Sequence, residues 1–212
     1  MRCLIIAGGN PPANALLQTQ LKHASYVIGV DGAAAFLRRL AVVPDVLIGD
    51  FDSADMACVE RLERAGARII RLPQEKNETD TEGAVCHAID AGADDIVLLG
   101  ATGKRTDHTL ANLSMLIRSE RAGVRCRIMD GYNELRAVSG EYDLYGRVGQ
   151  TVSILPLTAD IRVNATNLKY PLENLLLCMD ATRGISNIIE KSPAHLSISG
   201  GFALVAKIFG KA

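Results

Sequence analysis

The chain has 212 residues, of which 48% are hydrophobic and 22% are charged, and its formal net charge at pH 7 is −1. This composition excludes a disordered chain and supplies enough apolar residues for a sizeable core. The near-zero net charge, with no Lys/Arg run longer than two residues, argues against a partner that is duplex nucleic acid.

The cysteines are scattered along the chain, odd in number and without C-x-x-C spacing, so we expect free and mostly buried thiols in a reducing compartment. The N-terminus shows no signal-peptide pattern. No apolar stretch approaches the ~18 residues that a membrane span requires. We therefore expect a cytoplasmic protein that has no membrane partner.

The N-terminal part of the chain alternates short apolar runs with amphipathic segments, which is typical of a parallel α/β sheet. We expect strands at 4–7, 26–30, 42–48, 68–71, 96–99 and 127–129. We expect helices at 13–23, 33–40, 53–65, 79–91 and 107–122. Ser53 is the expected N-cap of the third helix, and Gly123 is the expected stop of the last one.

From about Asn133 onward, helical periodicity disappears and short alternating runs lie between turn residues. These runs occupy 152–155, 161–163, 175–177, 196–198 and 203–206. They predict a small antiparallel β-sandwich or partial barrel. The predicted fold class is α/β plus all-β, with a parallel α/β domain over 1–135 and an antiparallel β-sandwich domain over 136–212.

The segment Gly49-Asp50-Phe51-Asp52-Ser53 follows the third expected strand and brings two carboxylates just past its end. Residues i and i+2 of an extended backbone lie on the same side, so Asp50 and Asp52 should be close together. Their repulsion is relieved by a proton or a cation. Oxygen ligands suit Mg²⁺, which is usually shared with substrate phosphates. A solvated acidic turn is the alternative interpretation.

The ends of the other expected strands favour the metal interpretation. Polar or glycine-rich residues follow all six strands, and five of the six segments contain a carboxylate. In an open parallel sheet, ligands bind at the carboxyl ends of the strands. The sequence therefore predicts an active-site cleft at this edge. The segments are 8–10, 31–32, 50–52, 74–80, 100–107 and 130.

The glycine-rich segment from Gly100 to Arg105 suits a phosphate, because small residues let the backbone approach and N–H groups at a helix start favour an anion. Its spacing fits neither a Walker A loop nor G-x-G-x-x-G. Arg105 offers a donor fork that matches phosphate oxygens, and an ion pair with Asp107 is its alternative role. Lys76 offers a second cation, with a solvated loop lysine as the alternative.

Three further residues sit at helix starts near this edge. Thr79 fits a helix cap, with Glu82 completing a capping box, while Asp80 can face the cleft as a metal ligand. His108 is either a base or a structural residue, and Asn112 lies one helical turn beyond it. Carboxylates, a glycine-rich loop and cations together predict a nucleotide phosphate with Mg²⁺, and hence phosphoryl or pyrophosphoryl transfer or hydrolysis.

Several segments occur in the order seen in thiamin pyrophosphokinases, and together they cover nearly the whole chain. The N-terminal ones are Asp31-Gly32-Ala33, Gly49-Asp50-Phe51-Asp52-Ser53, Lys76-Asn77-Glu78-Thr79-Asp80 and Gly100-Ala101-Thr102-Gly103-Lys104-Arg105-Thr106-Asp107-His108. The C-terminal ones are Asn167-Leu168-Lys169-Tyr170-Pro171-Leu172, which resembles the family's G-L-K-[WY]-x-L stretch, and Gly184-Ile185-Ser186-Asn187, which resembles its S-N motif. Ala33, Asn77 and Asn167 depart from the family pattern without removing a proposed metal ligand.

The resemblance implies an enzyme that moves the pyrophosphoryl group of ATP to the hydroxyl of thiamin and releases AMP. It implies a homodimer whose active sites use both subunits. The implied Mg²⁺ ligands and catalytic carboxylates are Asp50, Asp52 and Asp80, and either Asp80 or Asp107 accepts the hydroxyl proton. The implied residues on the ATP side are Asp31, Lys76, Thr79, Gly100, Gly103, Arg105, Asp107, His108 and Asn112, and those on the thiamin side are Tyr170, Ser186 and Asn187.

Two other functions stay open from the sequence. One is a related pyrophosphokinase or kinase that acts on another alcohol such as a pterin; the Tyr170 and Ser186-Asn187 region favours thiamin instead. The other is a non-catalytic regulator that binds a nucleotide or thiamin. The intact set of carboxylates argues against it, because a binder could dispense with several of them.

Overall fold

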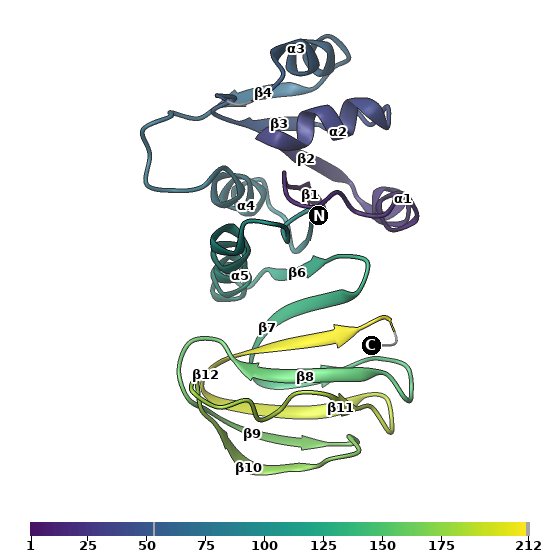
Figure 1. The fold of residues 1–212 in the computed structure, drawn as a ribbon, viewed down its shortest axis with the longest axis vertical. Coiled ribbons are helices and arrows are strands. Elements are labelled where there is room, and N and C mark those ends of the chain that lie inside the picture. Colours follow the sequence, from purple (N-terminus) through teal and green to yellow (C-terminus); the bar gives the residue numbers. More distant parts are fainter. Residues whose placement is uncertain (53, 211–212) are drawn as a thin grey trace. The chain divides into compact units, whose positions relative to one another are not determined.

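The computed structural model describes residues 1–52 and 54–210, which form two compact units, Met1–Asp130 and a second unit that begins at Gly131 (Figure 1). The sequence predicted the division after residue 135. The family resemblance implies that the first part binds ATP and that the second helps to hold thiamin, and both roles stay predictions.

The first unit is built on a parallel sheet whose described strands run in the order β6-β5-β1-β2-β3-β4. The chain adds β2, β3 and β4 on one side of β1 and then β5 and β6 on the other. Such a reversal is the switch point at which open parallel sheets bind ligands. The strands are β1 (Arg2–Ile6), β2 (Tyr26–Val30), β3 (Val46–Gly49), β4 (Arg68–Arg71), β5 (Asp95–Leu99) and β6 (Arg125–Met129).

Helices cover both faces of this sheet (Figure 1). On one face, Leu17 of α1, Leu37 of α2 and Val59 of α3 pack with buried side chains of the strands. The helices of the other face are α4 and α5. Their bounds are α1 (Asn14–His23), α2 (Ala34–Arg39), α3 (Met56–Arg64), α4 (Asp80–Asp90) and α5 (Thr106–Arg121).

Two of the boundaries that differ from the sequence prediction have a clear local cause. The third strand was expected over 42–48 but begins at Val46, because Pro44 has no N–H to donate and the Asp45 carboxylate instead accepts a hydrogen bond from the Val27 N–H at 2.7 Å. Helix α3 begins at Met56, where the Asp55 carboxylate accepts the N–H of Ala57. Ser53, the expected cap, lies outside the described residues.

The second unit is an antiparallel β-sandwich in which two long strands take part in both sheets. The first part of β12 pairs with β9 and the end of β7, and its last part pairs with β8 and the start of β7. Both strands bend at a glycine with positive φ, Gly140 (φ 71°) and Gly200 (φ 90°). The strands are β7 (Asn133–Leu144), β8 (Thr151–Pro156), β9 (Ile161–Thr166), β10 (Leu172–Leu177), β11 (Asn187–Ile188) and β12 (Ala194–Ile208).

Strand β7 was not predicted, and the runs at 196–198 and 203–206 proved to be two parts of the single strand β12. The core between the two sheets includes Ile154, Val163 and Leu196, all fully or almost fully buried. Among the described residues, no helix combines the length and the apolar character that crossing a membrane requires.

Asn167 departs from the family's glycine, and its backbone is left-handed (φ 62°), a conformation that asparagine tolerates better than most residues. The side chain also stabilises the turn, because its Nδ2 donates to the carbonyl of Pro193 at 2.9 Å. The backbone carbonyl of Asn167 accepts the N–H of Glu190 at 2.9 Å. Asparagine therefore replaces glycine here with a compensating hydrogen bond.

Asn167→Ala should lower the free energy of unfolding by about 2–3 kcal/mol, from the left-handed backbone and the lost hydrogen bond. Asn167→Gly should cost about 1 kcal/mol less, because glycine adopts this backbone freely. Denaturant titrations followed by circular dichroism measure both. If both variants lost the same free energy of unfolding, the left-handed backbone would not explain why position 167 is an asparagine.

Candidate active site

A cavity of about 750 Å³ lies in the first unit, lined by the segments that follow β1 to β5. This is the edge at which the sequence predicted a cleft. Asp52 and Asp107 are not among the lining residues. The predicted residues that line the cavity are Asp31, Asp50, Lys76, Thr79, Asp80, Gly100, Gly103, Arg105, His108 and Asn112.

Three carboxylates converge beside this cavity. Asp31, Asp50 and Asp52 each offer an oxygen, and these atoms lie within 4.8 Å of one another. Among the described residues, two buried carboxylate oxygens, Asp31 Oδ1 and Asp80 Oδ1, have no hydrogen-bond partner. Burial and the negative charges of Asp80, Asp50 and Asp52 raise the pKa of Asp31. The structure thus groups Asp31 with the predicted pair, whereas the sequence had named Asp80 as the third ligand.

Asp80 is instead joined to Asp50 by Lys76. The Lys76 Nζ lies 3.1 Å from the Asp50 carboxylate and 3.1 Å from that of Asp80. The lysine side chain is only 8% exposed, so it is not the solvated loop lysine of the alternative interpretation. Burial lowers the pKa of Lys76, but hydrogen bonds with the two carboxylates outweigh this effect and raise it.

The loop after β3 brings Asp50 and Asp52 together by a turn and not by an extended backbone, which corrects the i, i+2 argument. Phe51 has φ 57°, and its buried ring packs into the core, with the Arg71 guanidinium 5.4 Å from the ring centroid. The Asp52 N–H donates to the Asp50 Oδ1 at 3.2 Å. This bond, followed by the hydrogen bond from Lys76, lowers the pKa of Asp50.

Gly49 allows the ends of β2 and β3 to approach each other. A Cβ atom at this position would lie 2.8 Å from the Asp31 Cβ and 3.1 Å from its Cα. The Phe51 backbone of the loop after β3 favours the ionised Asp31 carboxylate, and it partly offsets the causes that raise the pKa of Asp31. Position 49 therefore requires glycine because Asp31 lies so close to it, and not only because of the conformation of its own backbone.

The glycine-rich loop after β5 packs against the loop after β1, backbone to backbone. The Gly9 N–H donates to the carbonyl of Gly100 at 2.8 Å, and the Asn10 N–H donates to that of Thr102 at 2.8 Å. A Cβ on Gly9 would lie 2.4 Å from both carbonyl oxygens of Gly100 and Thr102. Glycine is thus needed for loop packing, a role that the phosphate interpretation had not included.

The N-terminus of α5 lies at this loop, and its N-cap, Arg105, makes no side-chain hydrogen bond to the helix. Buried Asn112 holds the loop in place from inside the helix, because its Nδ2 donates to the carbonyl of Ala101 at 2.7 Å. An α-helix N-terminus without a side-chain cap attracts anions. Asn112 therefore positions the loop, and its predicted contact with a nucleotide stays a prediction.

Arg105 and Asp107 form the ion pair that the sequence left open as the alternative role of this arginine. The Arg105 Nε donates to Asp107 Oδ1 at 3.0 Å, and both side chains are exposed. The guanidinium holds the pKa of Asp107 well below its usual range. Exposed His108 lines the cavity beside them.

Thr79 caps α4, as predicted, because its Oγ1 accepts the Glu82 N–H at 3.1 Å. The reciprocal half of a capping box is replaced by a bond of the Glu82 carboxylate to Arg118 at 2.6 Å. Four further lining residues lie in the strand-end segments predicted to form the cleft, although none of them was assigned a role of its own from the sequence: Asn10, Gln74, Glu78 and Lys104. Thr109, just beyond the segment 100–107, was not predicted.

The residues predicted for the thiamin side lie in the second unit. Asn187 is buried, and its amide bonds to the backbone of Tyr170 twice, with Nδ2 donating to the carbonyl at 2.7 Å and Oδ1 accepting the N–H at 3.1 Å. Ser186 has φ 59°, and its N–H donates to Ser153 Oγ at 3.1 Å. Asn187 therefore holds the Tyr170 segment, and thiamin contacts of either residue stay predictions.

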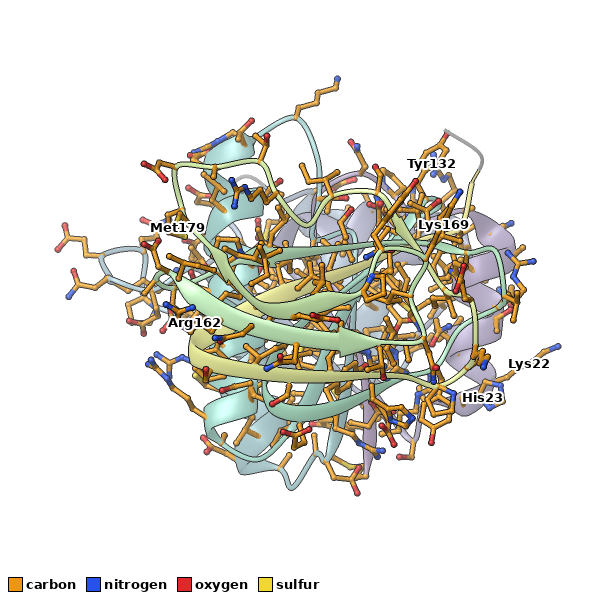
Figure 2. The ribbon with its side chains drawn as sticks, turned by 90° about the horizontal axis from the view of Figure 1, so that it is seen from below. Lys22, His23, Tyr132, Arg162, Lys169 and Met179 are labelled. Carbon is orange, nitrogen blue, oxygen red and sulfur yellow. The ribbon has the colours of Figure 1, made fainter. Side chains whose placement is uncertain are left out.

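The Tyr170 ring itself is 57% exposed. The Nζ of Lys169, labelled in Figure 2, lies 5.6 Å from the centroid of this ring. A cation at this distance from an aromatic ring is attracted by the ring's quadrupole. Tyr170 thus presents a ring face that already attracts a positive charge.

Comparison with known proteins identifies the family. The thiamin pyrophosphokinase catalytic domain matches residues 17–128, and the vitamin B1 binding domain of the same enzymes matches residues 141–202. A thiamine pyrophosphokinase of Bacillus subtilis is 30% identical over 208 residues, which cover 96% of each chain. Thiamin pyrophosphokinase 1 of Caenorhabditis elegans is 29% identical over 190 residues, 83% of this chain and 76% of that protein.

The fold agrees with these matches. The crystal structure of thiamine pyrophosphokinase from Bacillus subtilis has a TM-score of 0.87 to this chain at 28% identity, and each chain is covered completely. The structure from Geobacillus thermodenitrificans has a TM-score of 0.85 at 27% identity, covering 100% of this chain and 99% of the other. With two matched domains and a relative at 30% identity over nearly its whole length, the chain belongs to the thiamin pyrophosphokinase family.

Proposed function

We propose that the chain transfers the pyrophosphoryl group of ATP to the hydroxyl of thiamin, giving thiamin diphosphate and AMP. The observation that carries this proposal is the convergence of Asp31, Asp50 and Asp52 beside the cavity of about 750 Å³. Membership of the family supports the choice of thiamin as the acceptor.

We propose Mg²⁺ as the cofactor, bound by the carboxylates of Asp50 and Asp52. Asp31 and Asp80 are the other two carboxylates of this acidic cluster. The donors fit this ion, because they are all oxygens and the Asp31 Oδ1 is a buried acceptor without a partner. When bound, Mg²⁺ would neutralise charge that develops on the phosphates.

The ATP phosphates are proposed to lie against the glycine-rich loop and the start of α5. This placement is supported by the missing side-chain cap of α5 and by the cations Lys76, Lys104 and Arg105 in the cavity lining. Asn112 would keep the loop in its shape, through the hydrogen bond to Ala101, while the phosphates bind.

The proton of the thiamin hydroxyl is proposed to pass to the Asp80 carboxylate. Asp80 lines the cavity, whereas Asp107 is bound by Arg105 and lies outside the lining. A bond forms between the thiamin oxygen and the β-phosphorus, and the bond from the β-phosphorus to the oxygen that leaves on AMP breaks. Positioning of the two reactants would supply much of the rate, because phosphoryl-type transfer needs little covalent help from the protein.

A homodimer in the cytoplasm is part of the proposal. Family resemblance supports the dimer, and exposed apolar side chains of the second unit offer an interface. These are Tyr145, Val148, Tyr170, Met179 and Ile185. No disulfide joins the cysteines of the described chain, which favours a reducing compartment.

The function is tested by incubating the purified protein with ATP, Mg²⁺ and thiamin and resolving the products. AMP and thiamin diphosphate in equal amounts are expected. ADP as the nucleotide product would overturn pyrophosphoryl transfer, and the absence of any thiamin-dependent turnover would overturn the choice of acceptor.

Asp52→Asn should lower kcat by about a hundredfold or more, because it removes a charged oxygen ligand without removing volume. Steady-state assays at saturating ATP and thiamin measure this. Asp55→Asn is the matched control on the same segment, since among the described residues the Asp55 carboxylate bonds only to the first turn of α3, at Ala57 and Cys58, and asparagine caps equally well. Near-normal turnover of Asp52→Asn would contradict the metal assignment.

Gly49→Ala should lower kcat about tenfold to a hundredfold while the protein stays folded, because the added Cβ pushes Asp31 away from Asp50 and Asp52. Gly131→Ala is the control, since a Cβ there would meet nothing within 4 Å. Circular dichroism checks the fold of both variants. If Gly49→Ala kept full activity, the position of Asp31 would not matter for the reaction.

A further inference from the structure

Lys76 holds a place among the carboxylates that a metal ion would also seek. Its Nζ lies 3.1 Å from Asp50 Oδ2 and 3.1 Å from Asp80 Oδ1, and it donates to the carbonyl of Pro73 at 3.0 Å. The side chain is only 8% exposed. The ammonium thus donates hydrogen bonds to Asp50 and to the Pro73 carbonyl, and it forms an ion pair with Asp80.

Charge explains why a buried lysine stands there. Asp31, Asp50, Asp52 and Asp80 are close enough to raise the pKa of Asp31. Within the described residues, the ion pairs made with these carboxylates both come from Lys76. Like charges at such separations destabilise one another unless a cation is present. In the metal-free protein Lys76 is therefore the resident cation of the group.

A divalent ion held by Asp50 and Asp52 competes with Lys76 for the Asp50 carboxylate. Two cations beside one carboxylate repel each other, so entry of the ion weakens the ion pairs of the lysine. Lys76 also lines the cavity, and its flexible stem lets the ammonium reach new partners there. Phosphate oxygens are the anions that the proposed function places in this space.

We propose that Lys76 is an exchangeable counter-cation: it neutralises Asp50 and Asp80 before the divalent ion binds, is displaced by that ion, and then contacts the nucleotide phosphates. It is a positioning residue for the carboxylates first and a phosphate ligand second. This inference rests on the proposed function, because it needs both the divalent ion and the nucleotide. It predicts opposite effects on the two ligands when the charge of Lys76 is removed.

The first measurement is a titration of the metal-free full-length protein with Mn²⁺ alone, with free Mn²⁺ counted by electron paramagnetic resonance and Mg²⁺ added as competitor. Lys76→Met should bind Mn²⁺ at least about fivefold more tightly than the unchanged protein, the effect of one unit charge at about 4 Å even under water-like screening. Unchanged or weaker Mn²⁺ binding by a folded Lys76→Met would overturn the proposal.

The second measurement is the affinity for a non-hydrolysable ATP analogue at saturating Mg²⁺. Lys76→Met should bind the analogue about tenfold more weakly, because one charge-assisted contact is lost. Unchanged affinity would overturn the transfer of Lys76 to the phosphates. Lys76→Arg keeps the charge, so its Mn²⁺ affinity should stay within about twofold of the unchanged protein.

Lys104→Met is the matched control, since Lys104 is an exposed lysine of the same cavity lining. Its Mn²⁺ affinity should stay within about twofold at physiological ionic strength, where exposed charges are screened. If Lys104→Met raised the Mn²⁺ affinity as much as Lys76→Met does, the effect would be one of net charge alone, and the proposal would be overturned. Circular dichroism and melting curves check folding; if Lys76→Met fails to fold, Lys76→Gln replaces it.

These readouts separate the inference from the proposed function. If the unchanged protein bound neither Mn²⁺ nor Mg²⁺, the metal dependence of the proposed function would fail. If it bound the ion and produced AMP, but Lys76→Met had the same Mn²⁺ affinity, the function would stand and the role of Lys76 would fall.

Discussion

The cavity edge of the first unit is governed by one interaction, the repulsion among carboxylates that the fold holds close together. Asp31, Asp50 and Asp52 lie within reach of one ion, with Asp80 near Asp31. Folding has to offset this repulsion, which is an energetic cost that native proteins tolerate mainly where function requires it. Lys76 reduces the cost while leaving the Asp31 Oδ1 without a partner. The negative charge that Lys76 does not neutralise favours the binding of a further cation.

Several packing features serve this one cluster. Phe51 anchors the loop after β3 in the core, so that the aspartates on either side of it are held at the surface. Gly49 admits Asp31 from the neighbouring strand, and Asn112 fixes the loop on the far side of the cavity. Each of these residues acts through backbone position rather than through contact with a ligand. Precision at the site therefore comes from elements that are themselves rigid.

Much of the fold was predictable from the sequence because the strands of the first unit are continuous apolar runs, such as Tyr26–Val30, which matched its predicted bounds. Strand β7 was missed because its charged residues Glu134 and Arg136 break the expected alternation. They are accommodated by pairing with each other and with Lys207, which no local pattern reveals. The cavity edge followed from the residues that come after each parallel strand, whereas the pairing of Lys76 with Asp50 joins residues 26 positions apart, which no local pattern predicts.

The two bent strands of the β-sandwich constrain how this part of the chain can change. Because β7 and β12 each run through both sheets, a single inserted residue in either strand would reverse the inward and outward side chains in one sheet relative to the other. Changes of length are therefore confined to the connecting loops. One of these carries Tyr170, between β9 and β10, and another carries Ser186, just before β11, so the two sheets can keep one register while those loops diverge.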